Sequence, residues 1–388
     1  MKLQGRRVHI AGSAMPDAQF PLLMYAHDLI AQITERLALA GARFVIQLGK
    51  EPRVADNPAN PSITFDWTVA ETLGRLLESG GIQATTSEGP LIACVTTDRT
   101  STQVPADRIP LWDYLMASEA LLLSHVERGW TAGATRRQMQ SRLGDILLAL
   151  SGGEGVEHLA TEYALQSKPV IPLDLQLGSS CEDGSGGAAM LSGKMRAHPE
   201  RFIRLVEASR AGNVLMQMET REGRRAAETV ADAVLALLDA LAPPTAFYVR
   251  LLNRDLPDFE EIEKYFREVV DPTVLGHGYT PIEMGLVESS NPFINAEIFE
   301  RILDAPLSIV DLTGTRANCF TELGYAFGLG KRVLITAREG TELPFDTSAI
   351  DTRMWNLARS RPELISELED YWRRNINRPP LATPRSLT

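Results

Sequence analysis

Short apolar runs alternate with longer segments of helical spacing along the first half of the chain. The runs end near glycine or polar residues, which is typical of strands that stop at a turn. The segment that ends at Ala40 is followed by Gly41, a common residue directly after a helix. The pattern predicts strands at 7–11, 42–47, 91–95, 145–150 and 168–173, helices at 22–40, 67–77 and 156–166, and a helical or mixed segment at 111–123. This alternation indicates a mainly parallel sheet covered by helices.

The same rhythm starts again in the second half. It predicts strands at 246–252, 307–311 and 331–336 and helices at 259–270, 296–303 and 319–329. An amphipathic helix at 226–241 precedes it and is broken by Ala242-Pro243-Pro244-Thr245, because proline interrupts a helix. We therefore expect an α/β protein with two Rossmann-like or flavodoxin-like domains, at 1–242 and 243–378. Loops are predicted at 178–187 and 291–295, and a disordered tail at 379–388.

Composition excludes several classes of protein. The 388 residues include 50 acidic and 39 basic side chains, a formal charge of −11, which disfavours direct nucleic-acid binding and a polybasic membrane anchor. No apolar stretch is long enough for a transmembrane helix, and the basic start of the chain lacks the apolar core of a signal peptide. We expect a cytoplasmic protein with small-molecule partners and no membrane partner.

Cysteines and histidines give no sign of a disulfide framework or a metal site. The cysteines, Cys94, Cys181 and Cys319, are odd in number and far apart. The spacing of His125, His158 and His277 does not match a metal-binding motif. No Ser-His-Asp, Cys-His or Walker A arrangement occurs either. We therefore expect no metal and no cofactor.

A glycine-rich turn, Ser151-Gly152-Gly153-Glu154-Gly155, stands between a predicted strand and a predicted helix. Glycines let backbone N–H groups approach a ligand, and a helix N-terminus attracts a phosphate. Gly12-Ser13 follows the first strand, so both turns should meet at the carboxyl edge of the sheet, where α/β proteins bind ligands. The alternative is that the glycines only make tight connections. Four arginines precede the turn and either add charge to a phosphate site or form a solvated helix face: Arg128, Arg136, Arg137 and Arg142.

The first half resembles the SLOG superfamily, which includes the LOG phosphoribohydrolases, over about residues 5 to 180. The resemblance rests on Gly12-Ser13, on the turn at 151–155 and on Lys168-Pro169-Val170. The enzymes of that group share the pattern PGGxGTxxE. Here Ser151 replaces Pro, Val156 replaces Thr, and Leu159 stands where the catalytic Glu belongs. The resemblance therefore implies a nucleotide-sensing domain that binds its signal through Gly12, Ser13, Gly152, Gly153, Glu154, Gly155 and Arg128.

The stretch from Asp311 to Ala326 (DLTGTRANCFTELGYA) holds the second group of candidate residues. Asp311 ends a predicted strand, Asn318 lies near the N-cap of the next helix, and Glu322 lies near its first turn. A helix N-terminus favours an ionised carboxylate, and two carboxylates in different environments can divide the work of glycosidic cleavage. The alternative is structural: Asp311 caps the loop and Glu322 pairs with a surface base.

Residues 245 to about 350 resemble nucleoside 2-deoxyribosyltransferase-like domains, neighbours of TIR domains. The strand Phe247-Tyr248-Val249, the string above and Leu343-Pro344-Phe345-Asp346 carry the likeness. It implies that Glu322 is the nucleophile or oxocarbenium stabiliser and that Asp311 contacts base or ribose. The family's Met-Pro-Phe loop is replaced, and Arg250 and Arg254 there would favour a phosphorylated substrate. The expected substrate-binding residues are Tyr248, Arg250, Arg254, Thr313, Gly314, Asn318 and Asp346.

Together these features predict a nucleotide-sensing effector in antiviral defence. Binding of a nucleotide signal at the first domain would switch on cleavage of an N-glycosidic bond at Glu322, with NAD, a nucleotide or a nucleoside as substrate. Sites of this kind are often completed across an interface, so a homo-oligomer is expected. Two alternatives stay open: a two-site nucleotide-binding protein that signals without catalysis, and a constitutive nucleoside or nucleotide hydrolase.

Overall fold

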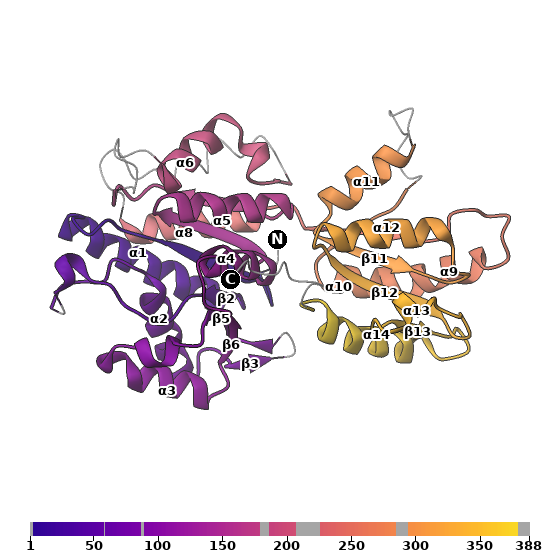
Figure 1. The fold of residues 1–388 in the computed structure, drawn as a ribbon, viewed down its shortest axis with the longest axis horizontal. Helices are drawn as coiled ribbons and strands as arrows, with labels where there is room; N and C mark the ends of the chain where they lie inside the picture. The colour runs from indigo at the N-terminus through magenta and orange to yellow at the C-terminus, as the bar shows by residue number, and fades with distance from the viewer. Residues whose placement is uncertain are drawn as a thin grey trace. The chain divides into compact units, whose positions relative to one another are not determined.

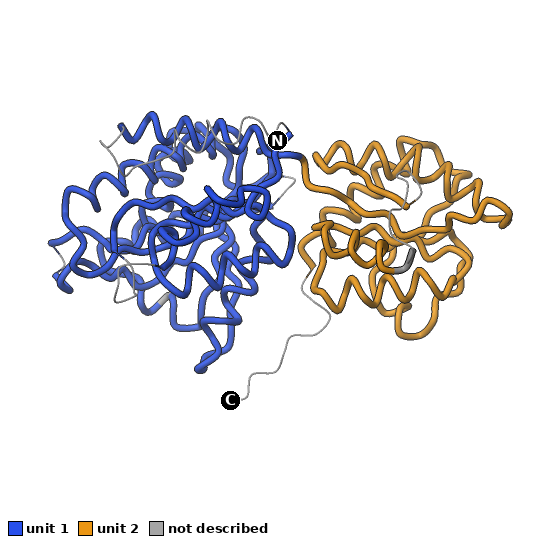
Figure 2. Tube along the Cα trace, turned by 90° about the horizontal axis from the view of Figure 1, so that it is seen from above, with its two compact units in different colours: residues 1–242, 386–388 blue, residues 243–385 orange. Residues whose placement is uncertain are grey.

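The chain folds into two compact units that separate between Ala242 and Pro243. The computed structural model describes residues 3–57, 59–86, 89–178, 186–206, 226–284 and 294–378. Figure 2 colours the two units separately. The predicted tail at 379–388, Cys181 and most of the predicted loop at 178–187 lie outside the described residues.

Unit 1 is built on a parallel sheet in the order β6-β5-β2-β1-β7-β8. The chain runs from the centre to one edge and then crosses back, so the strand order reverses between β1 and β7. Such a switch point opens a crevice at the carboxyl ends of the strands. The strands are β1 (Arg7–Ser13), β2 (Arg43–Ile46), β5 (Ile92–Thr97), β6 (Leu121–Val126), β7 (Ile146–Ser151) and β8 (Val170–Leu173). A short antiparallel hairpin is formed by β3 (Thr85–Thr86) and β4 (Gly89–Pro90).

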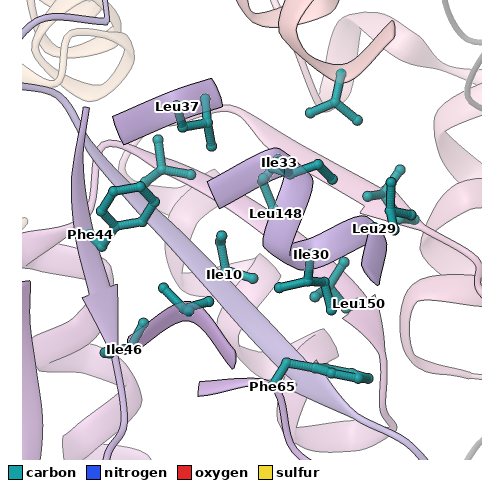
Figure 3. Packing of buried hydrophobic residues seen from close by; sticks show 14 of the residues in the cluster. Ile10, Leu29, Ile30, Ile33, Leu37, Phe44, Ile46, Phe65, Leu148 and Leu150 are labelled. Carbon is teal, nitrogen blue, oxygen red and sulfur yellow. The ribbon is translucent and has the colours of Figure 1, made fainter. Parts of the chain in front are cut away.

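Helices cover both faces of this sheet (Figure 1). On one face α1 (Phe20–Leu39) and α8 (Ala227–Ala240) pack together, and α2 (Asp66–Glu78) and α3 (Ile109–Ala117) belong to the same core. Apolar residues of α1 recur at helical spacing and fill this core. Figure 3 shows them against the strands: Leu29, Ile30, Ile33 and Leu37 with Ile10, Phe44, Ile46, Leu148 and Leu150.

The smaller core on the other face lies under α5 (Glu154–Leu165) and α6 (Gly187–Ala197), and α4 (Ala132–Leu143) packs beside α5.

Unit 2 holds a parallel sheet in the flavodoxin-like order β10-β9-β11-β12-β13. Its switch point lies between β9 and β11. The strands are β9 (Thr245–Val249), β10 (Thr280–Ile282), β11 (Leu307–Asp311), β12 (Arg332–Arg338) and β13 (Arg353–Trp355). Neighbouring residues of a strand face opposite cores, so that Tyr248 belongs to one core and Phe247 to the other.

The two cores of unit 2 have different helices over them (Figure 1). One is covered by α9 (Phe259–Tyr265), which continues through the π-helix η6 (Phe266–Val270) into α10 (Asp271–Gly276), and by α14 (Arg361–Asn375). The other is covered by α11 (Ile294–Asp304) and α12 (Ala317–Gly328). A short helix, α13 (Phe345–Ser348), follows β12.

The predicted fold class is confirmed, because both sheets are parallel and both carry helices on their two faces. The bounds of β11 are those predicted. Other elements differ for identifiable reasons. The segment 111–123 contains the end of α3 and the start of the edge strand β6, and β1 continues through Gly12 and Ser13 because Ser13 pairs with Ser151. Among the described residues, no helix is long and apolar enough to span a bilayer.

Candidate functional site

The first candidate site is the turn that follows β7 at the switch point of unit 1. Ser151 and Gly152 have left-handed backbone, with φ of 43° and 71°. The Gly152 N–H donates to the carbonyl of Ser13 at 2.9 Å, which ties the turn to β1. A Cβ on Gly12 would lie 1.7 Å from the Leu150 carbonyl oxygen. The close approach of β1 and β7 therefore requires glycine at position 12.

The turn leads directly into the N-terminus of α5. Gly153 is the N-cap residue and supplies no side-chain cap. Among the described residues, no acceptor is found for the N–H groups of Gly153, Glu154 and Gly155 or for the buried hydroxyl of Ser151. Unpaired N–H groups and the positive end of the helix dipole suit an anion such as a phosphate.

A second helix begins against the same turn. Gly187, the first residue of α6, donates its N–H to Glu157 Oε1 at 2.7 Å. A Cβ on Gly187 would lie 2.1 Å from the Gly152 carbonyl oxygen, so this contact also requires glycine. Glu157 thus caps α6 and joins it to α5, while Glu154 is exposed at the start of α5.

The arginines that precede the turn occupy different places. Arg137 Nε donates to His158 Nδ1 at 3.0 Å, and its Nη1 lies 3.8 Å from the place of a Cβ on Gly155. Arg128 follows β6 at the far edge of the sheet, with β5, β2 and β1 between that strand and β7, and it pairs with Asp98. The strand order therefore separates Arg128 from the turn and places Arg137 beside it.

A half-buried acid and a half-buried base, Asp66 and Arg136, lie at the same edge of the sheet. Burial raises the pKa of Asp66, at the start of α2, to about 6, although it accepts the Gln47 N–H at 2.7 Å. The charge of Arg136 opposes this rise. Arg136 has its Nε buried, and none of the described residues accepts from it. This acidic residue was not among the sequence candidates, because its neighbours come from distant parts of the chain.

The second candidate site follows β11 in unit 2. Asp311 is 2% exposed and accepts three hydrogen bonds. Thr313 N donates to Oδ1 at 3.0 Å, while Thr336 Oγ1 and Trp355 Nε1 donate to Oδ2 at 2.8 and 2.9 Å. Burial raises the pKa of Asp311, and these donors oppose the rise. Both oxygens are engaged in the interior, so Asp311 fixes the Thr313-Gly314 turn, whereas the sequence interpretation expected it to contact a base or ribose.

Glu322 has a different environment from the one predicted. Since α12 begins at Ala317, Glu322 lies in its second turn, and the stabilisation of an ionised carboxylate by the helix N-terminus fades within the first turn. Glu322 is half-buried, and burial raises its pKa to about 7. Among the described residues, no base or hydrogen-bond donor partners its carboxyl group. An unpaired acid that titrates near neutrality is a frequent property of catalytic carboxyl groups.

Of the remaining predicted substrate-binding residues, some are exposed and the others are buried. Gly314 is exposed in the turn before α12, next to the buried Thr313, and Asn318 is exposed in the first turn of α12. Tyr248 and Arg250 are buried and have structural partners: the Tyr248 hydroxyl donates to Asp271 at 2.9 Å, and Arg250 pairs with Glu263 and Glu283. Arg254 lies exposed in the loop after β9, and Asp346 lies exposed on α13. Arg250 is therefore not available to a phosphate.

Two arginines that the sequence interpretation missed lie at this turn. Arg316 Nη2 lies 3.3 Å from Asp258 Oδ2, and Arg338 Nη2 lies 2.7 Å from Asp258 Oδ1. The backbone N–H of Arg338 also donates to Thr313 Oγ1 at 2.9 Å. Arg316 stands within the stretch DLTGTRANCFTELGYA, which was its available signal, whereas Arg338 lies in the next strand and no motif marks it.

The described residues form no metal-binding cluster, and one depression lies in unit 2. In the described parts of the chain, no cluster of three His, Cys, Asp or Glu side chains could hold a metal ion. A depression of about 540 Å³ lies in unit 2 beside the segment that leads into β13, and its lining includes Leu343, Ile350 and Met354. Glu322 is not among its lining residues.

Comparison with known proteins identifies a family for the part of the chain that forms unit 1. The family model "ATP nucleosidase Cap17-like, N-terminal" matches residues 3–240. ATP nucleosidase Cap17 of Escherichia coli (strain KTE188) is 26% identical over 183 residues, which make up 47% of this chain and 35% of the relative. The chain thus spans about a third of the length of the curated relatives it matches.

Solved structures give weaker likenesses. The CMP N-glycosidase BcmB of Clostridium botulinum has a TM-score of 0.24 and 12% identity over 33% of this chain and 99% of its own. The protein TM1055 has a TM-score of 0.28 and 14% identity over 53% and 88%. At these scores the likenesses carry no weight for fold or function, and the SLOG-like and deoxyribosyltransferase-like interpretations stay predictions. Because the family model covers more than half of the 388 residues, the chain belongs to the ATP nucleosidase Cap17-like family, through the N-terminal region that forms unit 1.

Proposed function

We propose that this protein hydrolyses the N-glycosidic bond of a nucleotide or nucleoside, with Glu322 of unit 2 as the catalytic carboxylate. The observation that carries the proposal is the half-buried Glu322, which has no partner among the described residues and whose pKa burial raises to about 7. The relative named as an ATP nucleosidase supports the same reaction class. NAD, ATP and deoxynucleosides are all substrates to be tested.

The reaction requires few groups. The bond between C1′ and the base nitrogen breaks, and its electron pair stays on the base. The base of ATP or of a deoxynucleoside then takes up a proton, whereas the nicotinamide of NAD leaves as a neutral base without one. A water oxygen bonds to C1′ and releases a proton, so atoms and charge balance. An ionised Glu322 would stabilise the positive charge that develops at C1′ or attack it directly. Asp311 would act as a positioning residue that holds the turn before α12 through its three hydrogen bonds.

Unit 1 would bind a nucleotide that regulates this activity. The N–H groups at the start of α5, the Ser151-Gly152 turn and Arg137 form the expected phosphate site. Unit 1 has the buried Leu159 in the helix position where enzymes with the related pattern have a glutamate. The absence of a carboxyl group at that position favours binding over hydrolysis there.

A second candidate function is nucleotide binding at both units without turnover. The observation that favours it is the complete burial of Asp311, which leaves Glu322 as the one carboxyl group of the predicted pair that a substrate could reach. The same experiment separates the two functions, because only the hydrolase releases a free base.

The test is chromatographic analysis of products from NAD, NADP, ATP, CMP and a deoxynucleoside panel, with and without cyclic and ADP-ribose-type nucleotides. We expect base release from at least one substrate and a loss of at least about 100-fold in Glu322→Gln. Glu300→Gln, an exposed change on the neighbouring helix α11, is the matched control and should keep full activity. Full base release by Glu322→Gln would refute the assignment, and tight binding without any base release would favour the second candidate.

A further inference from the structure

Two guanidinium groups converge on one carboxylate at the switch point of unit 2. Asp258 is the N-cap residue of α9, which follows β9, while Arg316 is the N-cap residue of α12, which follows β11. Arg338 ends β12. The two N-cap residues lie at the starts of helices that cover opposite faces of the sheet, so the Asp258–Arg316 contact spans the crevice where the strand order reverses. Ligands of open α/β sheets bind in this crevice.

The guanidinium of Arg316 is incompletely paired. Its Nη2 reaches Asp258 at 3.3 Å, longer than the 2.7 Å contact of Arg338. Its Nε is buried, and no acceptor for it exists among the described residues. A buried N–H without an acceptor costs free energy, which an anion at the guanidinium could offset.

The start of α12 adds further donors beside Arg316. No side chain caps this helix, and in the described part of the chain the N–H groups of Ala317 and Asn318 have no acceptor. Asp258 and Glu261 balance the charge of the two arginines, so the surplus positive potential comes from the helix end. The two side chains are 27% and 36% exposed, so an anion in solvent can reach both.

Gly314 keeps this edge open. Its φ of 74° is a left-handed conformation, and the residue is exposed. A Cβ there would lie 3.0 Å from Asp258 Oδ2 and 3.2 Å from Arg316 Nη2. Glycine therefore lets a ligand approach the backbone and leaves the contact between Asp258 and Arg316 undisturbed.

We propose that Arg316 and Arg338, with the first N–H groups of α12, bind the 5′-phosphate of the substrate, and that Asp258 holds both guanidinium groups in position beforehand. The inference rests on the proposed function and narrows the substrate from a nucleotide or nucleoside to a nucleotide. Arginine suits this role because its planar fork of donors matches phosphate oxygens. Arg250, which the sequence singled out for a phosphate, is held instead by Glu263 and Glu283.

The test is the binding of ribose 5-phosphate and of ribose to the full-length Glu322→Gln protein by calorimetry. Arg316→Gln and Arg338→Gln should each weaken ribose 5-phosphate binding about 10-fold or more and leave ribose binding unchanged. Arg373→Gln is the matched control, since Arg373 is 43% exposed and paired with Asp370 in the last turn of α14. An Arg137→Gln background weakens binding at unit 1, so the remaining ribose 5-phosphate affinity reports mainly on unit 2, and a thermal melt of each variant checks its folding. Unchanged ribose 5-phosphate affinity in both folded variants would overturn the proposal.

The outcomes separate this proposal from the proposed function. If the protein cleaves a nucleotide, Arg316→Gln and Arg338→Gln, each made with Glu322 intact, should lower kcat/KM for that nucleotide. Neither variant should change kcat/KM for the matching nucleoside. If Glu322→Gln keeps its activity, the catalytic assignment fails, but the phosphate site still stands or falls by the binding measurement. If the arginines prove irrelevant while Glu322 is essential, only the phosphate assignment fails.

Discussion

The carboxyl edges of the two sheets are built in opposite ways. In unit 1 the edge requires glycine, because three backbone segments come into contact at Gly12, Gly152 and Gly187. In unit 2 the edge depends on a buried side chain, because Asp311 accepts hydrogen bonds from two other segments of the sheet and from its own turn. Both edges end at the N-terminus of a helix, but only the helix in unit 2 carries a half-buried glutamate in its second turn.

This difference shows how one architecture can serve binding or chemistry. Backbone N–H groups attract an anion and do not titrate, so the unit 1 edge is suited to recognising a phosphate. A half-buried carboxyl group exchanges protons near neutral pH, so the unit 2 edge is suited to bond cleavage. The following predictions test this contrast.

The largest effect is expected for Gly12→Ala. The added Cβ would lie 1.7 Å from the Leu150 carbonyl oxygen at a backbone φ of 154°, so β1 and β7 must move apart. We expect unit 1 to lose about 3 kcal/mol or more of unfolding free energy, measured by urea denaturation. Gly193→Ala on α6, where the Cβ meets open space, is the control and should be neutral or slightly stabilising. Equal stability of Gly12→Ala and wild type would show that the edge tolerates a side chain.

The matching change in unit 2 is Asp311→Asn. The amide would present an N–H group to donors that now face a carboxylate oxygen, so at least one buried hydrogen bond is lost. We expect unit 2 to be destabilised by about 2 to 3 kcal/mol. Asp346→Asn, on the exposed start of α13, should change stability by less than about 0.5 kcal/mol. If both variants denature at the same urea concentration, the Asp311 network does not hold the turn.

The raised pKa of Glu322 predicts that the stability of unit 2 depends on pH. Its folded pKa of about 7 lies above its ordinary value of 4.5, so between these values the folded state binds the proton that the unfolded state has lost. The unfolding free energy should therefore fall as pH rises from about 5 to 8, and Glu322→Gln should remove this fall. Glu300→Gln should leave it in place. For a carboxylate that must be ionised, kcat/KM should rise over the same range with a midpoint near pH 7.

The smallest effects concern the arginines of unit 1. Arg137→Gln should weaken nucleotide binding about 10-fold, about 1.4 kcal/mol, because its guanidinium lies beside the start of α5. Arg128→Gln should leave binding unchanged, because this residue follows the far edge strand and pairs with Asp98. Calorimetry with the same nucleotide in both variants makes the comparison. A loss in Arg128→Gln equal to that in Arg137→Gln would place the binding site elsewhere on the sheet.

The sequence by itself determined the α/β class, most of the central strands and the two turns that the sites share. These features follow from local patterns: apolar runs for buried parallel strands, helical spacing for the covering helices, and glycines where the backbone turns. The edge elements β6, β10 and β13 were not predicted as strands. The first is partly exposed and the other two have three residues each, so their apolar patterns are weak.

Only the tertiary structure decided what the polar residues do. Asp311 and Arg250 look like site residues in the sequence, but Trp355 and Thr336 engage the first, and Glu263 and Glu283 engage the second. Arg338 had no local signal, and it joins the site because β12 lies beside β11 and Asp258 starts a helix on the far side of the switch point. Spacing along the chain fixes local conformation, whereas burial and pairing depend on residues that are distant in sequence and meet only in the folded sheet.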